Sequence, residues 1–311
     1  MFKKIFPILC LSCAFIFSLL LLSGCENREL YRQARVMLGT FIEVNSTDPR
    51  AAKLVFDEIK RIENLLSKYE PESEITKLNK TGHLKASPET FYIIKKSKEF
   101  YEASGGAFDI TIAPLMDIWG FTDKQYKLPK KAQIKDALRL VGSDKIILQE
   151  SNNVIQFELS GMKIDLGAIA KGYCLDCAAK KLREAGIKNC LINAGGQVYC
   201  LGTRWNKPWR IGIANSRENR LSGYLELKNK FAATSGDYEQ YFIKNKKRYA
   251  HILNPQTGYP ADSKVSSVTV IADNGLTADA LATAIFVLGK DKGNELIKQF
   301  NDIQIKIVEE E

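Results

Sequence analysis

Apolar residues recur along the chain at two spacings. In some stretches they return every three or four positions, as at Val55, Ile59 and Ile62, which is typical of a helix with one buried face. In others apolar and polar residues alternate, as from Phe41 to Asn45, which is typical of a half-buried strand. The first spacing predicts helices over residues 49–66, 87–104, 127–140, 168–185 and 277–288, with another helix after them. The second predicts strands over 38–45, 145–148, 154–159, 189–201, 208–214, 222–227, 239–243, 266–272 and 303–308.

The order of these elements bears on the fold class. No internal repeat of about 20 to 50 residues is visible, and no low-complexity linker divides the chain. One compact, mostly antiparallel domain is the simplest account of this order of strands and helices. We therefore expect an α+β fold: a single compact domain over residues 37–311 with a mostly antiparallel sheet and flanking helices.

The N-terminus has the pattern of an export signal. Lys3 and Lys4 precede a run without charge over residues 5–22, and small residues lead to Cys25. An uncleaved membrane anchor is the alternative, because about 18 apolar residues nearly span a bilayer. The segment 22–25 (LSGC) resembles a bacterial lipobox, which favours a signal peptide over residues 1–24 and lipidation of Cys25. Residues 25–36 are then expected to be a tether, and the mature protein to be exported and lipid-anchored to a bacterial membrane, facing the periplasm or the cell exterior.

Charge adds little to this picture. The whole chain has a formal charge of +9, and removal of residues 1–24 takes away two lysines and lowers it to +7. A basic cluster over residues 244–248 lies between residues 241–242 (YF) and 249–250 (YA) and is expected to be the solvated turn of a hairpin. We expect no nucleic-acid partner.

Histidine and cysteine usage limits the chemistry. His83 and His251 are the only histidines, so a single chain cannot form a metal site with three histidine ligands, and oxygen-ligated ions become more plausible. Cys174 and Cys177 have CxxC spacing but lie in a predicted helix, where we expect buried structural residues. A disulfide in an oxidising compartment is the alternative.

Three segments could form a functional site, and each also has a structural explanation. Residues 165–173 (DLGAIAKGY) place a carboxylate, glycines and a lysine where a strand meets a helix, so exposed amides there could bind phosphate. The glycines could equally serve packing. The segment is neither a P-loop nor a GxGxxG motif.

The second segment is residues 277–283 (TADALAT). Asp279 and Thr283 are four apart on one helical face between alanines, and their oxygens suit a hard ion such as Mg²⁺. Alternatively, Thr277 caps the helix and Asp279 interacts with its dipole.

The third segment surrounds His251, which comes just before a predicted turn over residues 254–258 (NPQTG). A histidine at a strand end could act as a general base, although an isolated histidine can also be structural.

Together, and in this order, these segments resemble the ApbE family of FAD:protein FMN transferases. The resemblance extends over nearly the whole mature chain. It rests on residues 37–41 (MLGTF), 67–75 (SKYEPESEI), 106–121 (GAFDITIAPLMDIWGF), 165–173, 193–196 (NAGG), 234–236 (TSG), 251–258 (HILNPQTG) and 277–283.

The resemblance implies an exported, Mg²⁺-dependent enzyme that transfers the FMN half of FAD to a threonine or serine hydroxyl of a target protein and releases AMP. It implies that FAD is bound by Leu38, Tyr69, Ala107, Phe108, Asp109, Asp165, Lys171 and Leu253, several of them through backbone atoms. Mg²⁺ would be held by Ala168, through its carbonyl, and by Asp279, Ala282 and Thr283. Family members often carry methionine at position 38, and position 171 varies between lysine and glutamate.

The resemblance and the chemistry jointly assign His251 as the general base, because the attacking hydroxyl must lose a proton. Lys171 could assist the ion in neutralising the pyrophosphate. Target proteins would be membrane subunits of electron-transport complexes. Two other functions remain open: an FAD pyrophosphatase that releases FMN and AMP, and a non-enzymatic FAD-binding lipoprotein.

Overall fold

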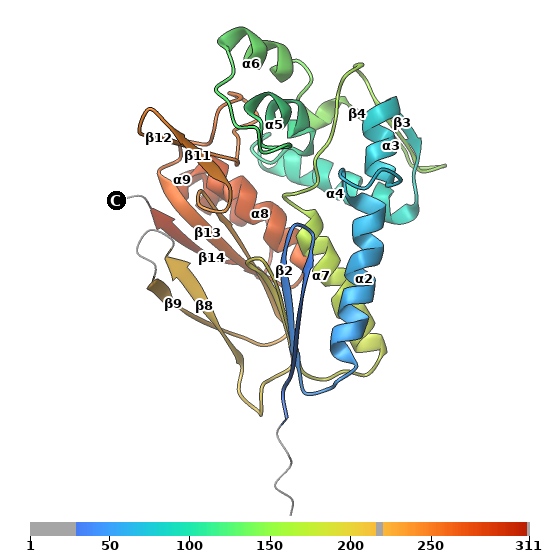
Figure 1. The fold of residues 1–311 in the computed structure, drawn as a ribbon, viewed down its shortest axis with the longest axis vertical. Helices are drawn as coiled ribbons and strands as arrows, with labels where there is room; N and C mark the ends of the chain where they lie inside the picture. Colours follow the sequence, from blue (N-terminus) through green and yellow to red (C-terminus); the bar gives the residue numbers. More distant parts are fainter. Residues whose placement is uncertain (1–28, 216–219, 310–311) are drawn as a thin grey trace, which may run out of the picture. The chain divides into compact units, whose positions relative to one another are not determined.

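The computed structural model describes residues 29–215 and 220–309, whose path is drawn in Figure 1. The predicted signal peptide and Cys25 lie outside the described residues. The helices of the described residues are α2 (Ala51–Leu66), α3 (Glu74–Thr81), α4 (Pro88–Ala103), α5 (Ala113–Trp119), α6 (Lys131–Leu138), α7 (Ala170–Glu184), α8 (Gly275–Leu288) and α9 (Lys290–Ile297). There are also two 3₁₀ turns, η1 (Ile110–Ile112) and η2 (Ser143–Lys145).

The strands form one large sheet and three small ones. The strands are β1 (Tyr31–Met37), β2 (Thr40–Ser46), β3 (His83–Lys85), β4 (Ile146–Gln149), β5 (Val154–Phe157), β6 (Cys190–Ala194), β7 (Gln197–Leu201), β8 (Trp209–Asn215), β9 (Arg220–Leu227), β10 (Lys230–Gly236), β11 (Tyr241–Lys244), β12 (Lys247–Ala250), β13 (Val265–Ala272) and β14 (Gln304–Glu309). The large sheet has the order β1-β2-β6-β7-β10-β13-β14, and every neighbouring pair in it is antiparallel. The small sheets are β3-β5-β4, β8-β9 and β11-β12.

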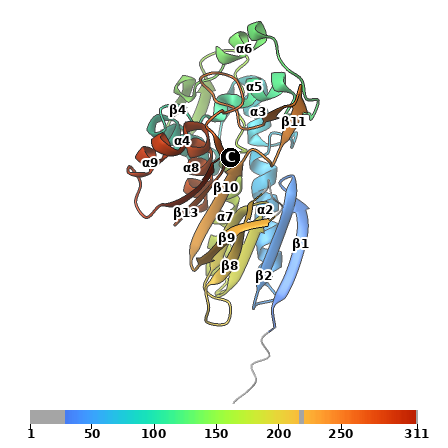
Figure 2. The same ribbon diagram turned by 90° about the vertical axis from the view of Figure 1, so that its left-hand side faces the viewer.

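Helices α2, α7 and α8 cover one face of the large sheet. Neighbouring helices in this layer contact one another, α2 contacts β2, and α8 contacts β10 and β13. The β8–β9 hairpin lies on the opposite side of the sheet from α2 and α7 (Figures 1 and 2). The main apolar core fills the space between sheet and helices, with Phe56, Ile192 and Val268 among its fully buried members.

The starts of α7 and α8 are in backbone contact. A Cβ atom on Gly172 would lie 2.1 Å from the carbonyl oxygen of Gly275, so only glycine permits this approach. Asp176 of α7 accepts hydrogen bonds from the N–H groups of Gly275 (2.6 Å) and Leu276 (2.9 Å) in α8. Asp279 of α8 accepts one from the N–H of Gly172 in α7 (2.9 Å). Each helix therefore supplies a carboxylate that satisfies free N–H groups in the first turn of the other.

A second apolar cluster holds the β11–β12 hairpin. Trp119 and Phe121 lie in its buried centre, and Phe242 and Tyr249 of the hairpin pack against them. Phe242 and Tyr249 are directly paired across the two strands, and their rings stack 5.1 Å apart. This cluster fixes the hairpin that ends at His251.

Most predicted elements are confirmed, including the four long helices and the mostly antiparallel sheet. The basic cluster is confirmed as a hairpin turn, with Asn245 and Lys246 both at positive φ between β11 and β12. The tether prediction is wrong for residues 31–36, because β1 pairs with β2 along its whole length. The pattern there was misleading because β1 is an edge strand whose central residues are all exposed, so it lacks the alternation of a half-buried strand.

Other elements were not predicted. Helices α3 and α5 are short, and β10 is rich in small residues that give no alternating pattern. Small residues fit β10 because α8 packs closely against it. The cap proposed for Thr277 is also wrong: α8 begins at Gly275, and the side chain of Asn274 accepts the N–H of Thr277 (2.8 Å).

The four cysteines in the described residues are free thiols. Cys174, Cys190 and Cys200 are buried, and Cys177 is partly buried. Burial raises the pKa of Cys190 to about 12 and that of Cys177 to about 11. These thiols behave as small apolar residues, as expected for Cys174 and Cys177. No helix among the described residues is long and apolar enough to cross a membrane.

The contact between α7 and α8 predicts a large effect of Gly172→Ala. The added methyl group would overlap the backbone of Gly275, and relief of such overlap typically costs about 1 to 3 kcal/mol. Urea unfolding should show this loss in the free energy of unfolding. Lys180→Ala, on the exposed side of the same helix, should change it by less than about 0.5 kcal/mol. Equal stability of the two variants would contradict the importance of the contact.

Candidate functional site

Asp165 joins three segments that are distant in sequence. Its backbone N–H donates to the carbonyl of Ile110 (2.7 Å), and its carboxylate accepts from Lys68 Nζ (2.8 Å) and from the N–H of Gly167 (2.8 Å). Lys68 and Asp165 are both largely buried, with side-chain exposures of 10% and 17%. This pair therefore holds the junction before α7 against the segments that contain Tyr69 and Asp109.

The pKa of Lys68 reflects this pairing. Burial alone would lower the pKa of the ammonium group, but the charge and hydrogen bond of Asp165 outweigh it and raise the pKa. The predicted carboxylate at position 165 is thus neutralised by a residue that sequence reasoning did not assign, although Lys68 lies inside the 67–75 motif. The Lys68–Asp165 pair therefore fixes the position of the segment before α7.

Asp109 organises the loop before η1. Its Oδ1 accepts hydrogen bonds from the N–H of Thr111 (2.8 Å), from Thr111 Oγ1 (2.7 Å) and from Ser143 Oγ (2.6 Å). Burial raises the pKa of Asp109, and these hydrogen bonds act in the opposite direction. Ala107 and Phe108 precede it, are also buried, and follow the turn at Gly105 and Gly106. The Phe108 ring packs on Phe100 in the core, so only the backbone of Phe108 remains for ligand contact.

Asp279 lies at the centre of a buried group of oxygens. Its side chain is 2% exposed; Oδ2 accepts from the N–H of Gly172, and Oδ1 accepts from Gln197 Nε2 (3.2 Å). Burial raises the pKa of Asp279, and the charge of Lys171 opposes this. Gln197 is also 2% exposed, and its Oε1 is a buried acceptor without a hydrogen-bond partner among the described residues.

Thr283 lies one turn after Asp279 on α8, as the spacing predicted. Its Oγ1 is 3.1 Å from Ser235 Oγ of β10. Ala282 is fully buried beside it, and Ala168 is partly buried in the turn before α7. The structure thus brings the α8 residues close to β10 and to the start of α7.

Lys171 is the second residue of α7, and its charge acts on residues of several other segments. Its charge lies within electrostatic reach of Asp279, Glu239 and His251 and lowers the pKa of each. For Glu239 the larger effect is desolvation, which raises its pKa. A lysine among two carboxylates and an imidazole is suited to receive an anionic ligand that also binds a cation.

His251 follows β12 and is partly buried. Its backbone N–H donates to the carbonyl of Gln240 (3.0 Å), and its Nδ1 lies 3.1 Å from the same oxygen. Burial lowers the pKa of His251 to about 4, while the Gln240 carbonyl and Asp165 act in the opposite direction. The imidazole is therefore neutral near pH 7.

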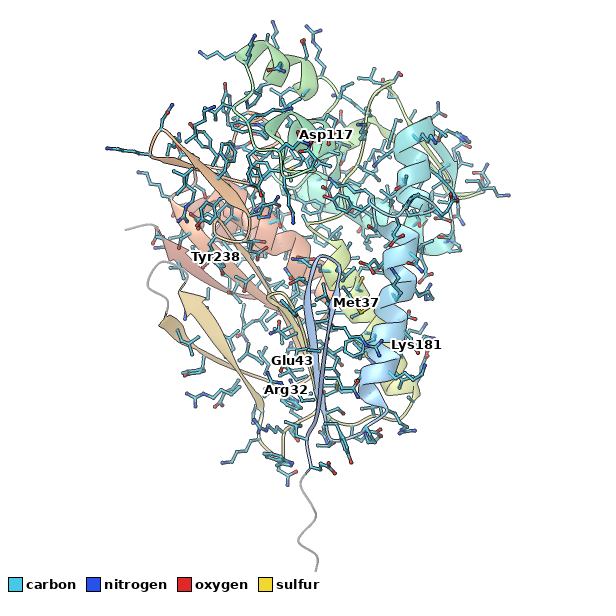
Figure 3. All side chains as sticks on the ribbon, in the orientation of Figure 1. Arg32, Met37, Glu43, Asp117, Lys181 and Tyr238 are labelled. Carbon is cyan, nitrogen blue, oxygen red and sulfur yellow. The ribbon has the colours of Figure 1, made fainter. Side chains whose placement is uncertain are left out.

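The remaining predicted residues lie in three different places. Leu38 occupies the turn between β1 and β2 with φ of 52°, and its N–H donates to Glu63 Oε1 (2.8 Å). Figure 3 places Met37 at this end of the hairpin and Arg32 toward the other. Tyr69 is 67% exposed, whereas Leu253 is buried in the second apolar cluster.

The turn at Leu38 packs against a second turn. A Cβ on Gly195 would lie 2.3 Å from Thr40 Oγ1, and one on Gly196 would lie 4.0 Å from Glu239 Oε1. The Leu38 turn and the 193–196 turn are therefore adjacent. The second turn also lies beside Glu239, on which the charge of Lys171 acts. Charge interactions link Asp165, Lys171, His251 and Asp279 directly; Tyr69 and Leu253 are linked to this group only through neighbouring residues.

Sequence reasoning missed Lys68, Gln197, Ser235, Glu239 and Gln240. Lys68 and Ser235 lie inside recognised motifs, and Gln197 directly follows one, so their neighbours carried a signal. Gln240 contacts His251 through its backbone carbonyl. Every residue has this group, so the residue type at position 240 does not predict the contact.

Comparison with known proteins identifies the family of the chain. The family model described as "ApbE family" matches residues 38–307. The FAD:protein FMN transferase of Klebsiella pneumoniae (strain 342) is 34% identical over 285 residues, which cover 89% of each chain. That of Haemophilus influenzae is 30% identical over 270 residues, which cover 83% of this chain and 78% of that protein.

Solved structures give the same result. The ApbE protein of Thermotoga maritima has 35% sequence identity and a TM-score of 0.82, covering 91% of this chain and 97% of its own. The flavin transferase ApbE from Vibrio cholerae has 26% identity and a TM-score of 0.81, covering 90% and 94%. By sequence, by fold and by the match of its motifs, the chain belongs to the ApbE family.

Proposed function

We propose that the protein is an FAD:protein FMN transferase that moves FMN from FAD to a threonine or serine hydroxyl of a target protein and releases AMP. The observation that carries this proposal is that Asp279 accepts a hydrogen bond from Gly172, directly after Lys171, whose charge acts on both Asp279 and His251. These residues supply a carboxylate for a cation, a positive charge for phosphate and a neutral imidazole for a hydroxyl proton. Family membership supports the same reaction.

The residues around Asp279 fit Mg²⁺. Asp279 is a buried carboxylate that receives hydrogen bonds from an amide and a backbone N–H, and Thr283 adds a hydroxyl one turn later. Oxygen donors of this kind suit a hard cation, and Gln197 provides a further buried oxygen nearby. The proposed ligands are Asp279, Thr283, Ala282 and the carbonyl of Ala168. When bound, the ion would supply Lewis-acid stabilisation of negative charge on the pyrophosphate.

The chain's own residues perform the remaining steps. Lys171 stabilises negative charge that develops on the phosphate oxygens. The hydroxyl oxygen of the acceptor forms a bond to the phosphorus of the FMN half, and His251 accepts the hydroxyl proton. The bond from that phosphorus to the bridging oxygen breaks, and this oxygen leaves with AMP. A bound pyrophosphate raises the pKa of His251 from its low value, because negative charge favours the imidazolium form.

The proposal extends to location and partners. The mature chain would begin at lipidated Cys25 and remain attached to a bacterial membrane on the exported side, which a mass measurement of the mature N-terminus would test. The sequence pattern over residues 1–25 supports this location. A tethered enzyme would meet acceptors on the same membrane, such as subunits of electron-transport complexes.

One incubation tests the activity itself. The purified protein, FAD, Mg²⁺ and a candidate acceptor protein are combined, and both the acceptor and the small molecules are analysed. Flavin fluorescence that stays on the denatured acceptor, with one AMP released for each attached FMN, is the expected result. Free FMN and AMP without labelled acceptor would indicate a pyrophosphatase, and intact FAD would indicate storage.

Replacement of Asp279 tests the metal site. Asp279→Ala should weaken the Mg²⁺ dependence and lower kcat by about 100-fold or more, because a principal oxygen ligand is lost. Asp273→Asn is the matched control, since Asp273 is exposed near the start of the same helix and pairs with Lys230. An unchanged Mg²⁺ titration in Asp279→Ala would show that the metal binds elsewhere.

Replacement of His251 tests the base. His251→Ala should retain FAD binding, measured by fluorescence quenching, yet lose about 10² to 10⁴-fold in transfer rate. The natural control is His83→Ala, because His83 is the other histidine and is exposed in β3. Undiminished FMN attachment by His251→Ala would remove His251 from the mechanism.

A further inference from the structure

Gln240 and His251 face each other at the open end of the β11–β12 hairpin. The ladder pairs Tyr241 with Ala250, so the next positions outward are Gln240 and His251. The backbone N–H of His251 continues the ladder to the carbonyl of Gln240 (3.0 Å). The Nδ1 of the same histidine lies 3.1 Å from the same oxygen.

This contact determines the tautomer of His251. A carbonyl oxygen has two lone pairs and no hydrogen, so it can accept both bonds but cannot donate either. In the neutral imidazole the proton must therefore be on Nδ1 for the contact to be a hydrogen bond. Nε2 is then left as an unprotonated acceptor, which is the state that a general base requires.

The side chain of Gln240 fixes the same peptide from the other side. Its Nε2 donates to the carbonyl of Phe121 (3.1 Å), and Phe121 is 2% exposed. The Phe121 ring meets the imidazole of His251 edge-on at 6.5 Å and packs against Phe242 of the hairpin. One amide therefore ties the carbonyl that orients His251 to a residue held in the second apolar cluster.

We propose that Gln240 is a positioning residue: its carbonyl holds the His251 proton on Nδ1, and its side chain locks that carbonyl to Phe121. Through this arrangement Gln240 keeps Nε2 of His251 free and directed for proton transfer. The proposal rests on the proposed function only in taking His251 as the base of the transfer reaction.

The charges that face His251 come from two neighbouring elements. Asp165, in the junction before α7, raises the pKa of His251, and Lys171, in α7, lowers it; burial has the largest effect and lowers it to about 4. A looser Gln240 peptide would expose the imidazole to water. The pKa of His251 should then rise toward its ordinary value of about 6.5.

The test uses Gln240→Met, which keeps the length of the side chain but removes the donor to Phe121. The matched control is Gln133→Met, because Gln133 also bonds the backbone, at the N–H of Lys130, but does so at the exposed start of α6. Nitrogen-15 NMR of the imidazoles needs no substrate. The spectrum contains two histidines, and exposed His83 serves as the internal reference.

In the wild type and in Gln133→Met, we expect His251 as the Nδ1–H tautomer, with a pKa well below the ordinary histidine value of about 6.5. In Gln240→Met, the Nε2–H fraction and the apparent pKa of His251 should both rise. With FAD, Mg²⁺ and acceptor, kcat should fall by about tenfold while KM for FAD changes by less than about twofold, as for loss of an orienting partner.

The proposal would be overturned by a wild-type His251 that is predominantly the Nε2–H tautomer, or by a Gln240→Met variant with unchanged tautomer, pKa and kcat. A loss of thermal stability alone, with tautomer and pH profile as in the wild type, would assign Gln240 a purely structural role and also contradict it. Failure of the proposed function is recognised separately, because a wild-type protein that labels no acceptor can still show the Nδ1–H tautomer.

Discussion

The mutual capping of α7 and α8 is the interaction on which the rest of the site depends. Asp176 satisfies the first N–H groups of α8, and Asp279 satisfies an N–H at the start of α7. Carboxylates are favourable at helix N-termini, where free N–H groups and the helix dipole provide positive potential. The bonds can form because Gly172 and Gly275 allow the backbones to touch. The junction that carries Asp165 and Lys171 is thereby fixed against the helix that carries Thr283.

The capping role of Asp279 conflicts with its burial. It caps α7 most strongly when it is ionised, yet burial raises its pKa and so opposes ionisation. The charge of Lys171 and the neutral donors Gly172 and Gln197 offset only part of the desolvation cost. A cation bound as proposed would offset the remainder. The same carboxylate would then couple metal binding to the stability of the helix pair, because ligands that bind the folded state alone stabilise it.

Sequence reasoning predicted most of the fold, for reasons that differ between elements. Long helices such as α2 and α4 have clear periodicity, and the position of Asp279 and Thr283 on one helical face follows from spacing alone. Strand β10 was missed because its residues are small, which gives no alternating pattern. Small residues occur there because α8 packs against this strand, and that contact cannot be read from the local sequence. Edge strand β1 was taken for a tether because neither side of it is a buried apolar face. At the site, Lys68 was missed because its partner Asp165 is distant in sequence, and Gln240 because it contacts His251 through its backbone carbonyl.

His251 shows how a residue with an unremarkable sequence context obtains a defined chemical state. One imidazole could be protonated, or neutral in either tautomer, and residue type does not choose among these states. Burial removes the charged form near pH 7, and the Gln240 carbonyl selects between the neutral forms. That carbonyl is placed by the β11–β12 ladder, whose position depends on the stacked rings of Phe242 and Tyr249 and on the cluster around Trp119. The apolar cluster therefore helps to determine which nitrogen of the His251 imidazole carries the proton.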